Sequence, residues 1–141
     1  MKKTKLILIV FLIFINGCAS NAVEIDTGDH FVKVNVEIAD TDEEQRTGLM
    51  NRESLGEYEG MLFIFEDSRE RTFWMKNTLI PLDIIFISED FEIINIERAE
   101  PCEKDPCTLY KSNGNAMYVL EVNEGFSEKS NINVGNSVEI L

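Results

Sequence analysis

Two carboxylates interrupt apolar segments of this sequence and are the first candidates for chemistry. Asp83 and Glu121 each lie within a run of hydrophobic residues. A carboxylate in such surroundings must be paired or must have a raised pKa. Two of them facing one another could perform acid–base chemistry, for example on a glycan. The structural alternative is that Asp83 caps a turn at residues 76–78 or pairs with Arg52 or Arg71.

Histidine and methionine give less support to other chemistries. His30 is the only histidine, and it lies beside a polar connector, so we interpret it as a solvated residue rather than the base of a nucleophilic site. The thioethers of Met50, Met61, Met75 and Met117 could bind copper(I). These residues are not clustered, however, and filling the core is the ordinary role of methionine. We therefore expect no metal site and no cofactor.

A short connection at residues 76–81 is the candidate binding segment. It contains Leu79 and Ile80, although surface loops are normally polar. An apolar surface with a few convergent polar groups is typical of small-ligand pockets. The alternative is that Leu79 and Ile80 plug one end of the fold, while Asn77 and Thr78 bond the backbone of their own turn. The predicted binding residues are Met50, Arg52, Trp74, Lys76, Asn77, Thr78 and Asp83.

The elements that must position these residues are mostly β-strands. Residues 60–87 form the densest apolar stretch outside the N-terminus, and they include the only tryptophan. We interpret this stretch as three strands, separated by a polar break at residues 66–71 and by the turn that follows Trp74. Aromatic residues bury large areas, so we expect these strands to form the heart of the core.

The rest of the chain adds further strands and little helix. Residues 31–38 alternate between apolar and polar side chains, which predicts a half-buried strand. Thr41 and Glu44 form a capping box, and the helix that follows should end near Gly48. Short interrupted strands of this kind predict a mostly β fold, a single compact antiparallel β-sandwich or small barrel with one or two short helices. The remaining expected elements are strands at 91–98, 116–122 and 138–141 and helical turns at 125–130.

The N-terminal segment has the features of an export signal. Residues 1–5 are basic, and residues 6–15 are purely apolar but shorter than the ~20 residues of a membrane-spanning helix. The following Ile-Asn-Gly-Cys18 resembles the lipobox of bacterial lipoproteins. This resemblance implies cleavage before Cys18 and a lipid on that cysteine. The alternative is an ordinary secretory signal that is cut at Ala19 or Ser20.

These features predict a domain organisation and a location. We expect a lipoprotein signal peptide at residues 1–17, a flexible tether at 18–30 and a single β domain at 31–141. The expected location is the cell envelope, with the lipid on Cys18 as the membrane anchor. In Gram-negative lipoproteins, an alanine after the cysteine favours the outer membrane, where the domain would face the periplasm.

The charge of the chain narrows the range of partners. Loss of residues 1–17 removes three lysines and leaves 10 basic residues against 26 acidic ones, a net charge near −16. Such a surface repels phosphate backbones, which makes nucleic acid a poor partner. It also repels anionic lipid headgroups, so the lipid must provide the membrane attachment.

Cys102 and Cys107 are the two cysteines of the expected domain. An exported chain meets an oxidising compartment, so we expect these residues to form a disulfide. Closing so short a loop stabilises the fold by roughly 2 kcal/mol on the chain-entropy model. The alternatives are weaker, because redox pairs of the thioredoxin type have two intervening residues instead of four, and zinc would need two further ligands.

An ordered set of motifs extends from about residue 31 to the end of the chain. The motifs are Gly48-Leu-Met-x-Arg52, Gly60-Met-Leu-Phe-x-Phe65, Phe73-Trp-Met-Lys-Asn-Thr78-x-x-Pro-Leu-Asp-Ile-Ile-Phe-Ile87, Pro101-Cys102 with Cys107 and Tyr110, Val119-Leu-Glu-Val-Asn-x-Gly125, and Val134-Gly135. Together these motifs resemble the family called domain of unknown function 192. The resemblance implies a compact, mostly β domain of bacterial and archaeal proteins that are often exported, and it implies no established activity, substrate or cofactor. One departure is Glu89-Asp90-Phe91, where many members have a glycine in the turn.

Two hypotheses about function follow. The first is a lipid-anchored, non-catalytic domain that binds a small molecule, a glycan or another envelope protein. The alternative is a carboxylate-dependent hydrolase that acts on an envelope glycan. A structure distinguishes them, because Asp83 bonded to backbone amides or to an arginine favours the first, whereas two free carboxylates about 5–9 Å apart across a cleft favour the second.

Overall fold

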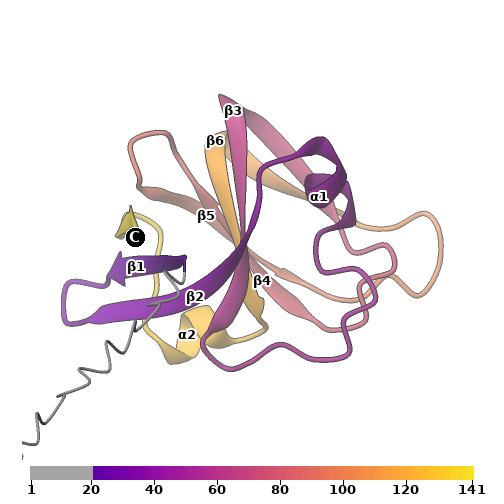
Figure 1. Ribbon diagram of the computed structural model, residues 1–141, viewed down its shortest axis with the longest axis horizontal. Helices are drawn as coiled ribbons and strands as arrows, with labels where there is room; N and C mark the ends of the chain where they lie inside the picture. Colours follow the sequence, from indigo (N-terminus) through magenta and orange to yellow (C-terminus); the bar gives the residue numbers. More distant parts are fainter. Residues whose placement is uncertain (1–20) are drawn as a thin grey trace, which may run out of the picture.

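The computed structural model describes residues 21–141 of the 141-residue chain. The predicted signal peptide and Cys18 lie outside the described residues. Seven strands and two short helices make up the described part (Figure 1). Neither helix within residues 21–141 has the length and apolar character that a membrane span needs. The elements are β1 (Ala22–Asp26), β2 (Phe31–Ala39), α1 (Asp42–Thr47), β3 (Glu59–Trp74), β4 (Leu82–Ile87), β5 (Ile93–Ala99), β6 (Leu109–Asn123), α2 (Phe126–Lys129) and β7 (Ser137–Ile140).

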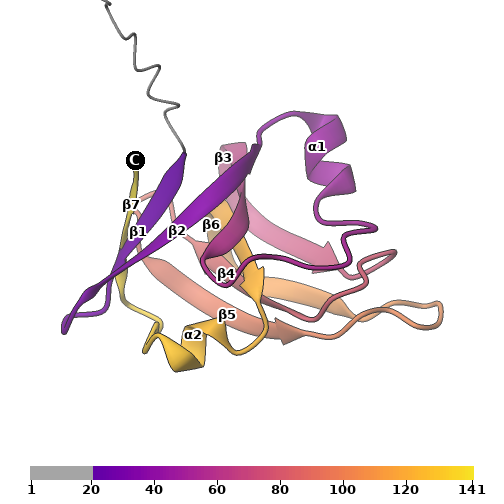
Figure 2. The same cartoon turned by 60° about the horizontal axis from the view of Figure 1, so that its bottom comes forward.

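The strands form one curled sheet in the order β5-β4-β6-β3-β2-β1-β7. The sheet wraps into a half-barrel (Figures 1 and 2), and its two edge strands approach one another at a bridge between Glu92 and Ser137. The mostly β fold is confirmed, but the prediction of a purely antiparallel sheet is wrong. Strands β2 and β3 pair in parallel, because α1 and the loop after it carry the chain back along the sheet before β3 begins.

The predicted polar break at residues 66–71 is also wrong, since β3 continues through it. The 16-residue strand pairs with β6 along both halves, with shifts of register between Ile64 and Arg69 and again before Thr72. Most of these polar side chains are exposed, because this part of the strand extends past the core. Arg71 is the exception: it is buried, and its guanidinium donates to the Ala116 carbonyl and to the Asp67 carboxylate.

Strand β1 corrects the predicted tether at residues 18–30. It pairs with β2 on one side and β7 on the other, and Ala22, Val23 and Ile25 are completely buried. The alternation of Val23 and Ile25 with acidic residues is the pattern of a half-buried strand. The ordered domain therefore includes residues well before position 31.

Two hydrophobic clusters occupy the two faces of the sheet. The first contains residues from all seven strands, as the interior of a curled sheet must, and α2 closes it with Phe126. The second lies on the opposite face beneath α1, where Leu49, Met61, Phe63 and Phe86 pack together. Because successive residues of a strand point to opposite faces, β4 contributes to both clusters and is buried along its whole length.

The strands of residues 60–87 supply much of the core, as predicted, but Trp74 does not belong to it. It is the last residue of β3, and 48% of its surface is exposed. Its neighbours Phe73 and Met75 belong to the second cluster, whereas Trp74 pairs across the sheet with Leu109, which is 57% exposed. The largest buried aromatic residues are instead Phe63 and Phe86.

The turn before β5 departs from the family pattern in a way that the structure explains. Phe91 adopts a left-handed backbone conformation, with φ of 60°, which costs little for glycine but is strained for a bulky residue. Its ring stacks on Tyr118 with a centroid distance of 5.0 Å. This aromatic contact offsets the strain at a position where a glycine would have no side chain to pack.

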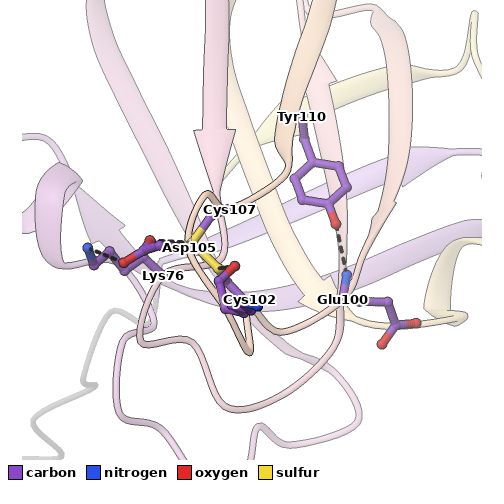
Figure 3. The surroundings of a disulfide bond; sticks show 7 residues. Lys76, Glu100, Cys102, Asp105, Cys107 and Tyr110 are labelled. Carbon is purple, nitrogen blue, oxygen red and sulfur yellow. Dashed lines mark hydrogen bonds and ion pairs between the residues drawn. A yellow bond between two sulfur atoms is a disulfide. The ribbon is translucent and has the colours of Figure 1, made fainter.

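The disulfide between Cys102 and Cys107 is confirmed (Figure 3). It closes the loop between β5 and β6, and the Cys102 amide donates to the Met75 carbonyl at 3.3 Å. Within the loop, Asp105 forms an ion pair with Lys76 at 3.5 Å. The disulfide closes the loop on itself, and the contacts with Met75 and Lys76 hold the loop against the segment that follows β3.

Candidate functional site

A small recess opens on the second-cluster face, between α1 and the ends of β3 and β6. Its walls are residues 45–50 from α1 and the following turn, together with Phe63, Phe73, Trp74 and Thr78. Glu121 on β6 also lines it. The recess holds about 30 Å³, which is room for roughly one water-sized group.

Glu121 sits in the middle of the sheet with apolar neighbours on both sides. Its cross-strand partners are Met61 on β3 and Ile84 on β4, and directly paired residues point to the same face. Only 5% of Glu121 is exposed. Within residues 21–141, no hydrogen bond and no opposite charge compensates the burial, which raises the pKa of Glu121 to about 8.

The raised pKa makes Glu121 an uncharged carboxylic acid for most of the time at pH 7. In that form it has one O–H donor and further acceptor capacity. Buried polar groups in native proteins are nearly always hydrogen-bonded. An unpaired carboxyl beside a recess is therefore ready to interact with a group that enters from outside.

The aromatic wall is rigid at its base and exposed at its rim. Phe73 packs edge-on against Phe63 at a centroid distance of 5.0 Å and against Phe86 at 5.9 Å. Trp74 follows at the rim, and the Lys76 ammonium lies 5.5 Å from its ring centroid. Interlocked rings at the base hold the shape of the recess, while the exposed indole is free to contact a ligand.

Helix α1 forms the opposite wall, and the sequence accounts for where it begins and ends. The predicted capping box is confirmed, since Thr41 and Glu44 satisfy one another's backbone amides. Gln45 docks the helix on β3 by donating to the Ile64 carbonyl at 2.7 Å. Gly48 ends the helix with a φ of +46°, and a Cβ there would lie 3.2 Å from Phe63. This position therefore suits glycine on both counts.

The recess brings together three of the seven predicted binding residues. Met50, Trp74 and Thr78 line it. The loop after Trp74 matches the plug of the alternative hypothesis only in part, because Ile80 packs on the second cluster whereas Leu79 is 55% exposed.

The other residues of the loop serve its own structure. Asn77 adopts a left-handed conformation with φ of 57°, and its carbonyl accepts from the Asn51 amide at 2.8 Å. Lys76 pairs with Asp105 of the disulfide loop. These contacts fix the path of the loop, and they leave Thr78 as the part of it that borders the recess.

Arg52 lies outside the recess, in a neighbouring groove. Its guanidinium makes a bidentate ion pair with Glu37 on β2. Nη1 lies 2.9 Å from Oε1, and Nη2 lies 2.6 Å from Oε2. The ion pair lowers the pKa of Glu37. The groove is wider and more open than the recess, with a volume of about 410 Å³, and at its edge Arg52 and Glu37 neutralise one another.

Asp83 also lies elsewhere and caps α2. Its carboxylate accepts from the Gly125 amide at 3.1 Å and from the Ser127 amide at 2.9 Å, and the Arg98 guanidinium approaches to 3.9 Å. The predicted structural role is thus correct in kind. The predicted partners are wrong, because Arg52 pairs with Glu37 and Arg71 with Asp67.

Asp83 and Glu121 do not form a carboxylate pair. Asp83 is paired with Val122 in the sheet, whereas Glu121 is paired with Ile84. The two acids therefore point to opposite faces, Asp83 toward the first cluster and Glu121 toward the second. A single substrate cannot lie between them.

Other reactive groups within residues 21–141 are engaged or exposed. In this part of the chain, one group of three potential metal ligands lies close enough together to hold a metal ion. It consists of Cys102, Asp105 and Cys107. Both cysteines are in the disulfide and cannot act as thiolate ligands. His30 is exposed in the β1–β2 turn and contacts Thr27.

Sequence reasoning missed the α1 wall of the recess and the separate role of Glu121. The signal for Glu121 was present, because an acid within the strand Val-Leu-Glu-Val shares its face with Val119. No comparable signal marks residues 45–48, which border the recess only because the chain crosses over from β2 to β3.

Comparisons with known proteins agree with the fold. The chain is similar over 86% of its length to 94% of a protein from Sinorhizobium meliloti 1021 that carries the provisional description of a transcription regulator, with 33% identity and a TM-score of 0.80. It is 38% identical to a protein of unknown function from Novosphingobium aromaticivorans DSM 12444, with a TM-score of 0.78, covering 84% of this chain and 83% of that one. No curated protein matches significantly.

A family model supplies the assignment. The model for domain of unknown function 192, described as "Uncharacterized ACR", matches residues 23–140. This range begins within β1 and ends within β7, so it includes every described helix and strand at least in part. The chain therefore belongs to the family of domain of unknown function 192.

Proposed function

We propose that this protein is a non-catalytic, lipid-anchored envelope domain that binds a ligand through the recess at Glu121. The observation that carries the proposal is the carboxyl of Glu121, which is buried and unpaired within residues 21–141 and borders a recess with an aromatic wall. Ligand sites are typically apolar concavities with a few convergent polar groups. Here the polar groups are Gln45, Arg46, Thr47, Thr78 and Glu121, and Trp74 supplies exposed aromatic surface.

The arrangement of acids supports binding over hydrolysis. Glycoside hydrolysis in its usual forms requires two carboxyls that flank the scissile bond. Asp83 is committed to the amides that open α2 and lies on the other face of the sheet. Glu121 therefore acts alone as a recognition group.

The envelope location rests on the sequence. The apolar segment that ends at Cys18 supports export and lipidation, and the net charge near −16 supports a partner other than nucleic acid. For this reason the description of the S. meliloti relative is not extended to this chain. The ligand is a small molecule, a glycan or part of another envelope protein.

The anchor is tested by Cys18→Ser, which removes the sulfur that would accept the lipid. Fatty-acid labelling of cells should mark the wild type and not the variant. Equal labelling of both would contradict the lipoprotein assignment.

The binding site is tested by a thermal-shift screen of the purified protein against amines, sugars and envelope fragments. We expect at least one class to raise the melting temperature of the wild type and of Glu139→Gln, whose side chain is exposed on β7. The same ligand should fail to stabilise Glu121→Gln. A ligand that stabilises both variants equally would place the site away from the recess.

A further inference from the structure

We propose that the recess at Glu121 receives the primary ammonium group of a ligand, with the Glu121 carboxylate as its counter-ion. The inference rests on the proposed function and gives the ligand class for the same site. It is carried by three features: the size of the recess, the absence of any cation against Glu121 within residues 21–141, and the aromatic wall.

The size of the recess limits what can enter. A volume of about 30 Å³ suits a compact group better than a sugar ring. A guanidinium is planar and wider, whereas an ammonium is a compact point charge at the end of a flexible chain. Among charged groups, a primary ammonium therefore suits the space beside Glu121 best.

Within residues 21–141, no cation is close enough to Glu121 to balance its ionised form, although Arg46 lines the same recess. Its neighbours in the sheet, Met61 and Ile84, are apolar. On the α1 side, the Gln45 amide is committed to the Ile64 carbonyl, and Arg46 is exposed at the rim. Such a site favours an external cation over a neutral group, because only the cation compensates the buried carboxylate.

The aromatic wall already has an ammonium group beside it within the domain. The Lys76 ammonium lies 5.5 Å from the Trp74 ring centroid, within the range of a cation–π contact. Lys76 itself is held by Asp105 and does not line the recess. The acidic surface of the whole domain adds a long-range attraction for cations.

Binding of an ammonium requires a proton to leave. The uncharged Glu121 carboxyl loses its O–H proton to the solvent, and the carboxylate that remains pairs with the incoming ammonium. Because burial raises the pKa of Glu121 to about 8, one proton is released for each ligand bound near pH 7. Affinity for an ammonium should therefore increase with pH, by up to tenfold for each unit, until the pH reaches that pKa.

The test uses Trp74 as a reporter, since it is the only tryptophan and lines the recess. The purified full chain is titrated with n-butylammonium, n-butanol and tetramethylammonium at pH 6.5 and 7.5. We expect a saturable change of tryptophan fluorescence with n-butylammonium, about 5–10-fold tighter at the higher pH. n-Butanol should bind weakly without pH dependence, and tetramethylammonium, which is too bulky for the recess, should not compete.

The variants separate the two proposals. Glu121→Gln should weaken n-butylammonium binding by at least tenfold and abolish its pH dependence, whereas Glu139→Gln should bind like the wild type. If n-butanol binds as tightly as the amine in a Glu121-dependent way, the ammonium proposal is overturned and the recess remains a ligand site. Amine binding that is absent, or that is unchanged by pH in the wild type, also overturns the ammonium proposal, whether or not the variant folds.

Discussion

The same pair of strands carries two buried acids with opposite fates. Asp83 on β4 is 3% exposed and Glu121 on β6 is 5% exposed, and they are neighbours across the sheet on opposite faces. Asp83 accepts from two backbone amides and lies near Arg98. Glu121 has no such partner within residues 21–141. Burial alone therefore does not identify a functional carboxyl, and the difference lies in whether the fold supplies its partners.

The largest effect is expected from Asp83→Ala. The change leaves the Gly125 and Ser127 amides without their acceptor in a buried place, so the free energy of unfolding should fall by about 3 kcal/mol. Urea denaturation at pH 7 measures it. Asp83→Asn keeps one acceptor oxygen and should lose less. A loss below about 0.5 kcal/mol for Asp83→Ala would mean that the cap is not structural.

Glu121→Gln should instead raise the free energy of unfolding. The folded-state pKa of Glu121 is raised to about 8, above its ordinary value of 4.5, so its contribution is fully present below pH 4.5 and is lost as the pH rises toward 8. Glutamine does not titrate. The variant should match the wild type near pH 4 and exceed it by about 3 kcal/mol at pH 7.

Melting curves of both proteins at matched pH values check this expectation. The other carboxylates titrate equally in the two proteins, so the difference reports on position 121. A constant difference from pH 5 to pH 8 would show that Glu121 ionises as readily as an exposed acid, and the contrast with Asp83 would disappear.

The smallest effect is expected from Arg52→Ala, which extends the comparison to a third acid, Glu37. Both side chains of this ion pair are substantially exposed, and exposed pairs contribute at most about 1 kcal/mol. The melting temperature should change little, and ligand binding at the recess should persist. Loss of binding with unchanged stability would move the site toward the groove beside β2.

The sequence predicted those features that depend on neighbouring residues. The alternation in residues 31–38, the capping box at Thr41 and the apolar run of β4 all have their predicted structures. The Cys102–Cys107 disulfide was also predictable, because the chemistry of an exported chain and a spacing of five residues favour it. Each of these signals lies within a short stretch of the chain.

The features that were missed depend on residues far apart in the sequence. The partners of Asp83 lie 42 and 44 residues away, and the parallel pairing of β2 with β3 depends on the path of the loop between them. Residues 66–71 look like a loop because a strand that extends beyond the core has no apolar face. For the recess, the sequence identified Met50, Trp74 and Thr78, but it could not place α1 against Glu121.

Strand β1 begins at Ala22, only four positions after Cys18. Even a fully extended chain of four residues reaches no more than about 14 Å. A lipid on Cys18 would therefore hold β1 within two Debye lengths of the headgroups, since that length is about 8 Å at physiological salt. At that range an anionic leaflet repels the acidic domain. In Figures 1 and 2, α1 is separated from β1 across the width of the molecule, so the recess would lie farther from the anchor than β1 does.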